Sequence, residues 1–228
     1  MVSVIITAFY YQGYRQQLDR YSIMADVNRV SSRYQNENVY ILSDIPQLTN
    51  RPITSDRDYI ISLSNIISKI QGPLIMYFSG HGVIKHNKFW LMTPWYQHPR
   101  VKYISGQSIA DIINNNKITE LFYILDCCYA TGIAKDIVGN ILIPGRAISS
   151  CKENQKCGFL SNPPYGSLFT YFWSMIIPQI RTYQDIKNKI DDHIIKQTTQ
   201  SGRSAQNITM VLNNRAVAES QYKIPDYV

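Results

Sequence analysis

The sequence has few charged residues, no long uninterrupted apolar run and no block of basic residues, and each absence excludes a class of protein. Only 17% of the 228 residues are charged, whereas 45% are hydrophobic. Disordered chains combine high charge with low hydrophobicity, so a largely disordered protein is excluded. A chain of this length can bury a sizeable core without disulfide or metal support. We therefore expect one globular domain over residues 1–228.

The apolar segments are too short or too interrupted to cross a membrane. Segment 2–9 is apolar but lacks the basic flank of a signal peptide, and it is shorter than a membrane span. The charge-free stretch 157–180 contains Pro163, Pro164 and Pro178, so its apolar part is expected to be a core helix. Four cysteines in a chain without an export signal predict reduced thiols in a reducing, cytoplasmic compartment. No membrane partner is expected.

The net charge of +7 does not come from any one segment of the chain. Residues 1–100 hold ten basic and six acidic side chains, and residues 101–228 hold thirteen and ten. Nucleic-acid-binding surfaces gather Lys and Arg on one face or stripe, whereas this even spread favours a solvated surface that keeps the protein soluble. A nucleic-acid-binding module is thus a weak alternative without a recognised motif, and we expect no nucleic-acid partner.

Apolar, β-branched segments alternate with amphipathic segments along the chain. We expect strands at 2–9, 38–43, 74–78, 89–92, 120–126, 147–149 and 208–212. We expect helices beginning near 19 or 22, 54, 105 or 108, 167 and 183. Apolar strands separated by helices predict an α/β fold, with a mostly parallel central sheet flanked by helices on both faces.

Two of the expected strands end in residues suited to nucleophilic catalysis. Strand 74–78 leads into Gly80-His81-Gly82, and strand 120–126 leads into Cys127-Cys128. The carboxyl ends of parallel strands meet at one edge of a sheet, so an imidazole base and a thiol nucleophile can meet there. A glycine lets a backbone N–H approach a substrate carbonyl oxygen closely. Taken singly, the histidine could be an ordinary loop residue and the cysteines packing residues; together they favour catalysis.

The chain resembles the metacaspases, which belong to the caspase-like cysteine peptidases. The motifs that carry the resemblance are Tyr40–Asp44, Tyr77–Gly82, Asp126–Cys128, Ile148–Gln155 and Tyr165–Tyr171. They occur in the family's order and cover nearly the whole chain. The resemblance implies a caspase-like fold, with a large-subunit-like part over about 1–135, a small-subunit-like part over about 146–228, and a monomer.

The resemblance also implies a His-Cys dyad that cleaves protein or peptide substrates after Arg or Lys. By motif position the nucleophile is Cys128 and its partner is His81, with the N–H groups of Gly82 and Cys128 holding the oxyanion. Successive strand residues point to opposite faces, so only one of the two neighbouring cysteines can serve, and Asp126 shares the face of Cys128. Asp126 and Asp26 would bind the substrate cation. Asp26 could otherwise be a helix acid that complements the helix dipole.

One departure from the family concerns calcium. Relatives that need calcium carry an Asp-Asp pair before the helix preceding the cysteine strand, where this chain has Ser105-Gly106-Gln107-Ser108. Asp136 matches one further family ligand. Because calcium prefers several charged oxygen ligands, we expect activity without calcium, and no metal or other cofactor.

A second function fits the same resemblance. Some caspase-like proteins are catalytically silent and bind or regulate another peptidase. Such proteins commonly lose the histidine or the cysteine, and both are present here as His81 and Cys128. The peptidase is therefore the favoured function, and the silent regulator is the alternative.

Overall fold

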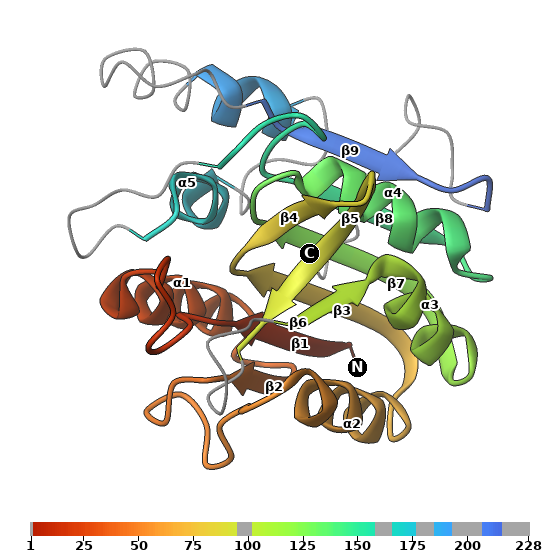
Figure 1. Ribbon diagram of the computed structural model, residues 1–228. Helices are drawn as coiled ribbons and strands as arrows, with labels where there is room; N and C mark the ends of the chain where they lie inside the picture. The colour runs from red at the N-terminus through yellow and green to blue at the C-terminus, as the bar shows by residue number, and fades with distance from the viewer. Residues whose placement is uncertain (1, 95–101, 158–165, 177–184, 193–206, 216–228) are drawn as a thin grey trace.

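A computed structural model describes residues 2–94, 102–157, 166–176, 185–192 and 207–215. The strands of this part are β1 (Ser3–Ala8), β2 (Asn38–Ser43), β3 (Gln71–Ser79), β4 (Gly82–Lys85), β5 (Lys88–Thr93), β6 (Lys102–Ser105), β7 (Lys117–Asp126), β8 (Gly145–Ser149) and β9 (Thr209–Leu212). Six of them form a central sheet in the order β2-β1-β3-β7-β8-β9 (Figure 1). All of its pairings are parallel except β8 with β9. Strands β4, β5 and β6 form a small antiparallel sheet.

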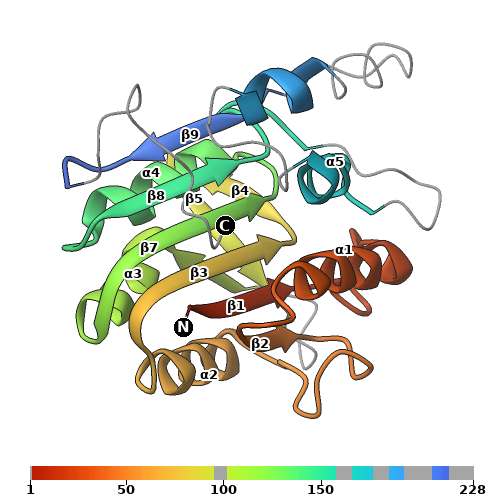
Figure 2. The ribbon, with the colours of Figure 1, turned by 180° about the vertical axis from the view of Figure 1, so that it is seen from behind.

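Helices cover both faces of the central sheet. They are α1 (Arg20–Arg33), α2 (Asp56–Ile67), α3 (Gly106–Asn114), α4 (Ala130–Asn140) and α5 (Leu168–Ile176). One core cluster joins the sheet to α2, α3 and α4, and a second joins its other face to α1 and α5 (Figures 1 and 2). The predicted α/β fold with a mostly parallel, doubly covered sheet is confirmed, and it is consistent with a caspase-like fold.

Side-chain caps fix where three of the helices begin. The carboxylate of Asp19 and the hydroxyls of Ser55 and Ser105 each accept a hydrogen bond from the backbone N–H three residues further along the chain, at 2.7, 3.1 and 3.1 Å. These bonds satisfy N–H groups that have no partner within the helix. The predicted starts of α1, α2 and α3 are confirmed.

Helix α4 and the short strands β4 and β6 were not predicted from the sequence patterns. Helix α4 starts at Tyr129 without a side-chain cap, and it carries glycines at 132 and 139, which disfavour helix. Seven of its eleven residues are nevertheless buried. Tertiary packing rather than local propensity therefore makes this segment helical, which a local pattern does not reveal.

Some predicted segments fall partly outside the described residues. The last expected helix is described at 185–192, where it is helical, and the first residue of the motif at 165–171 is not described. Within the described ranges, no helix combines the length and apolarity needed to cross a membrane.

Candidate active site

The two predicted catalytic side chains follow neighbouring strands that end together. Strands β3 and β7 pair in parallel with Ser79 opposite Asp126, and the Gly80 N–H donates to the Asp126 carbonyl at 3.3 Å. His81 and Cys128 each lie two residues beyond this pair. Both therefore emerge at the same edge of the sheet, as the sequence predicted.

The imidazole of His81 is held by the loop that follows β1. Its Nε2 lies 2.5 Å from the carbonyl oxygen of Gln16, and its ring stacks on Tyr11 with centroids 4.6 Å apart. The Tyr14 ring approaches edge-on at 6.3 Å. Because a carbonyl oxygen can only accept, Nε2 carries the hydrogen, and Nδ1 is left as the basic nitrogen.

Tyr11 fixes the backbone of the histidine as well as its ring. The Tyr11 hydroxyl accepts a 2.7 Å hydrogen bond from the His81 N–H and donates one of 3.1 Å to the Met92 carbonyl. Tyr11 is fully buried and has a positive φ of 64°, a conformation that costs a side-chain-bearing residue about 1–3 kcal/mol. Buried Asp44 supports this backbone by accepting the N–H groups of Tyr10 and Tyr11 at 2.9 and 2.7 Å.

The two adjacent cysteines have different environments. Cys127 is fully buried in the core shared with α4, and burial raises the pKa of its thiol well above the usual range. Cys128 is only partly buried. The residue after it, Tyr129, has a φ of 60° and begins the turn into α4. Cys128 is thus the one of the two that a substrate can reach, in line with its predicted role.

Gly82 packs directly against this cysteine turn. A β-carbon added at Gly82 would collide with the Cys128 carbonyl oxygen and would lie 3.1 Å from the Cys127 sulfur. A glycine is therefore required here by close packing, in addition to any role of its N–H. This contact brings Gly82 beside Cys128, as the sequence predicted.

Burial keeps both members of the proposed dyad uncharged in the free protein. It lowers the pKa of His81, although the hydrogen bond to the Gln16 carbonyl acts in the opposite direction. It raises the pKa of Cys128, which a backbone N–H of Cys157 partly offsets. Within the described chain, no hydrogen bond joins His81 to Cys128. The resting pair is therefore a neutral imidazole and a thiol, and sulfur attack requires a proton transfer to His81.

The two predicted substrate-binding aspartates are both fully buried and lie on the side of the sheet that α1 and α5 cover. Asp26 on α1 accepts the Ser167 N–H with both carboxylate oxygens, at 3.0 and 3.2 Å, and lies 3.5 Å from the Arg29 guanidinium. Asp126 accepts a 2.5 Å bond from the Thr170 hydroxyl through Oδ2. Ser167 just before α5 and Thr170 in its first turn thus join both acids, an arrangement that their sequence positions do not reveal.

Asp126 lies close enough to Asp26 to affect its pKa. Burial, followed by repulsion from Asp126, raises the pKa of Asp26 well above its usual range. Burial also raises the pKa of Asp126, and the hydroxyls of Ser167, Thr170 and Ser150 oppose this rise. Asp126 Oδ1 is buried and has no hydrogen-bond partner among the described residues. Burial and mutual repulsion disfavour ionisation of both acids, and a cation bound between them would offset this cost, although neither acid has exposed surface in this structure.

Residues 105–108, whose lack of carboxylates underlies the expectation of calcium independence, lie at the start of α3, which packs on α4. Gly106, the first residue of α3, packs on Asp136 so closely that an added β-carbon would lie 2.6 Å from its Oδ2. Asp136 also accepts a 3.3 Å hydrogen bond from the Asn140 amide. Within the described ranges, no group of three or more His, Cys, Asp or Glu side chains is arranged to hold a metal ion. Calcium independence stays a prediction.

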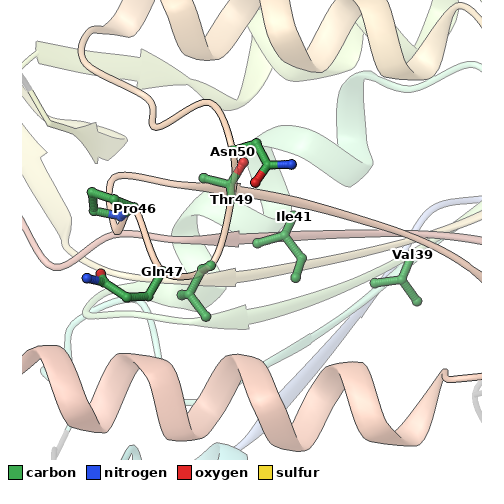
Figure 3. A pocket seen from close by; sticks show the side chains of 7 residues that line it. Val39, Ile41, Pro46, Gln47, Thr49 and Asn50 are labelled. Atoms are coloured by element: carbon green, nitrogen blue, oxygen red, sulfur yellow. The ribbon is translucent and has the colours of Figure 1, made fainter.

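A pocket of about 300 Å³ lies away from these residues, beside β2 at the edge of the central sheet (Figure 3). Val39 and Ile41 of β2 and the loop 46–50 line it. It contains no titratable side chain. We therefore assign it no part in the chemistry.

The sequence matches neither a protein-family model nor a curated protein. Its fold does have a counterpart among solved structures. The crystal structure of GSU0716 from Geobacter sulfurreducens, a structural genomics target, is similar over 99% of this chain and 98% of that chain. The TM-score is 0.64 and the sequence identity is 10%. At this identity the similarity shows a shared fold and says nothing about activity.

Proposed function

We propose that this protein is a cysteine endopeptidase, related to the metacaspases, that cleaves peptide bonds after Arg or Lys. The observation that carries the proposal is that His81 and Cys128 each lie two residues beyond the pair formed by Ser79 and buried Asp126 at the ends of β3 and β7. A base, a nucleophile and an acid suited to a cationic side chain thus share one edge of the sheet.

In the proposed reaction the Cys128 sulfur attacks the scissile carbonyl carbon. Its proton passes to Nδ1 of His81, since the Gln16 carbonyl occupies Nε2. The imidazolium then protonates the leaving amine and a thioester forms. The neutral imidazole next takes a proton from a water molecule, which attacks the thioester. The C–S bond breaks, the acid is released, and the imidazolium returns the proton to the Cys128 sulfur. Tyr11 and Gln16 act by positioning the histidine.

The N–H groups of Gly82 and Cys128 are the proposed donors to the oxyanion that forms during each attack. Their proximity follows from the contact of Gly82 with the Cys128 backbone. A donor of this kind contributes about 3–4 kcal/mol to transition-state stabilisation in well-studied peptidases.

Asp26 and Asp126 would bind the cation of the P1 residue, the residue that precedes the scissile bond. Neither acid has exposed surface in the free protein, so this binding requires the structure around them to open. A guanidinium or ammonium group would supply donors to the unpartnered Asp126 Oδ1 and would relieve the repulsion between the two acids. Aspartate at P1 would instead add a third carboxylate. The electrostatics of the buried pair therefore favour basic over acidic P1 residues.

The alternative is a catalytically silent caspase-like protein that binds another peptidase. The neutral resting dyad and the absence of a His81–Cys128 hydrogen bond within the described chain are compatible with it. Retention of both side chains at one sheet edge favours the enzyme.

Turnover of peptides by matched cysteine variants distinguishes the two. Wild type and Cys127→Ala should release fluorophore from Arg- and Lys-terminated peptides, whereas Cys128→Ala should not. Loss of the nucleophile costs up to about 10⁶-fold in comparable enzymes. An inactive, folded wild type would favour the silent regulator, and an active Cys128→Ala would exclude Cys128 as nucleophile.

A further inference from the structure

All four cysteines of the chain gather around the end of β7. Cys127 and Cys128 follow β7 directly. Cys151 and Cys157 lie in the segment after β8, and their sulfur atoms are 3.1 Å apart. Both thiols also point at one backbone group, the Cys127 carbonyl oxygen, at 3.3 and 2.8 Å. A disulfide requires a sulfur separation of about 2.05 Å, so the pair needs to close by roughly 1 Å.

A tight turn holds the two thiols together. The Gln155 N–H donates to the Lys152 carbonyl at 3.1 Å, and the Gln155 side-chain oxygen accepts the Lys152 N–H at 3.2 Å. Residues 151 and 157 are thus brought together by a turn that already exists in the folded protein. Little loop-closure entropy is left to lose when a bond forms between them.

Cys151 and Cys157 differ in reactivity. The difference suits oxidation of the Cys151 sulfur first, followed by attack of the Cys157 sulfur on it. Cys151 packs beside the start of α4, and its carbonyl accepts hydrogen bonds from the Thr131 N–H and hydroxyl at 3.2 and 2.7 Å. The Cys157 thiol lowers the pKa of Cys151 by donating to its sulfur, and backbone groups of Ala130 and Tyr129 add to this effect. Cys151 thereby has the thiolate character of a reactive cysteine. Cys151 has no exposed surface and Cys157 is partly exposed, so a peroxide would approach the pair from the side of Cys157.

We propose that Cys151 and Cys157 form a reversible disulfide in the presence of a peroxide, and that its formation lowers the reactivity of Cys128. The Cys151 thiolate attacks one oxygen of hydrogen peroxide, giving a sulfenic acid and, after protonation of the leaving hydroxide, water. The Cys157 sulfur then displaces the sulfenic hydroxyl, which leaves as a second water. Two thiols and one peroxide become one disulfide and two waters, and a dithiol reductant reverses the change.

The link to Cys128 runs through hydrogen bonds between the two segments. The Tyr129 N–H donates to the Gln155 carbonyl at 2.8 Å, and the Cys127 carbonyl oxygen lies within hydrogen-bond distance of both sulfur atoms. A disulfide has no S–H group, so that carbonyl loses its thiol donor and keeps the Ser150 hydroxyl, at 3.5 Å. The backbone N–H of Cys157 bonds the Cys128 sulfur and favours its thiolate, and we expect closure of the disulfide to weaken this hydrogen bond. Thiolate formation at Cys128 becomes less favourable, and any peptidase activity falls with it.

The disulfide itself is independent of the proposed function, and only its effect on turnover rests on that function. The reduced full-length protein is treated with hydrogen peroxide, blocked with N-ethylmaleimide and mapped by peptide mass spectrometry. We expect a Cys151–Cys157 cross-link with the loss of two hydrogens, which dithiothreitol reverses, and free thiols at 127 and 128. Unlinked Cys151 and Cys157, or a disulfide that includes Cys128, would overturn the proposal.

The second measurement is the rate at which iodoacetamide labels Cys128. Peptide mass spectrometry follows the labelling, so that any oxidation of Cys128 itself is detected. In wild type we expect labelling to slow several-fold after the cross-link forms and to recover on reduction. Cys157→Ser keeps a donor to the Cys127 carbonyl but cannot cross-link, and its labelling rate should not respond. An equal rate in the reduced and cross-linked wild type would refute the coupling. Neither readout requires turnover, so a protein that cleaves no peptide but forms the cross-link contradicts only the proposed function.

Discussion

The Tyr11 hydroxyl accepts the backbone N–H of His81 at 2.7 Å, while its ring stacks on the imidazole at 4.6 Å. One residue thus restrains the predicted base in both backbone and side chain. Tyr11 is itself held in a left-handed conformation by the Asp44 carboxylate. The base is therefore positioned by a network that begins at the end of β2.

Tyr11→Phe should lower kcat roughly tenfold while leaving KM within about twofold, since small displacements of a catalytic group can cost up to about 100-fold. The ring stack is retained and only the hydroxyl is lost. Tyr14→Phe, at the second ring contacting His81, is the matched control and should be close to wild type. Unchanged kcat in a folded Tyr11→Phe protein would contradict a positioning role.

The alkylation rate of Cys128 should keep rising as the pH passes about 9. Burial raises the pKa of Cys128 and lowers that of His81, so the thiolate–imidazolium pair is disfavoured in the free protein. The measurement is iodoacetamide labelling of Cys128 between pH 6 and 10, followed by peptide mapping, with dithiothreitol present during storage only. A labelling rate that levels off near neutral pH would show a preformed ion pair instead.

Asp26→Asn should stabilise the protein increasingly as the pH rises above about 4. The pKa of Asp26 is raised in the folded state, so the folded protein binds a proton that the unfolded chain has already released, and the free energy of unfolding falls as the pH rises toward the folded pKa. Each unit of difference between the folded and unfolded pKa values changes the free energy of unfolding by about 1.4 kcal/mol. Asparagine keeps an oxygen to accept the Ser167 N–H.

Urea denaturation from pH 4 to 8 measures this effect, and Asp192→Asn, at an exposed carboxyl, controls for the loss of one negative charge. The free energy of unfolding of Asp26→Asn minus that of wild type should grow across this range, whereas the same difference for Asp192→Asn should not. An advantage that shrinks with rising pH would mean that Asp26 is stabilised as a carboxylate in the fold.

Chelation should leave peptidase activity unchanged. Where calcium-dependent metacaspases carry paired acids, α3 begins with Gly106 against Asp136. Activity on an Arg-terminated peptide is compared with and without EDTA, and calcium binding is measured by calorimetry. Loss of activity on chelation that calcium restores would refute the prediction.

The strand ends that carry His81 and Cys128 could be predicted because their signals are local. Apolar runs give the strands, and parallel pairing brings their carboxyl ends together without further information. The caps of α1, α2 and α3 are local in the same sense. The α/β fold and the placement of the two residues follow from these features.

The partners of the site could not be predicted because they are distant or are backbone groups. The Gln16 carbonyl orients His81, and a backbone carbonyl leaves no signal in the residue type. Ser167 is 141 positions from Asp26. Helix α4, which carries two glycines, forms through tertiary contacts alone. Long-range packing decides each of these features.

The central claim is that the buried side chains of Asp26 and Asp126 select a cation at the P1 position. The most direct test compares cleavage of one fluorogenic peptide series that differs only in its P1 residue: Arg, Lys, Asp and citrulline, the uncharged analogue of Arg. The account predicts turnover after Arg and Lys, with little after citrulline and none after Asp. Cleavage after Asp, or equal rates for Arg and citrulline, would contradict it.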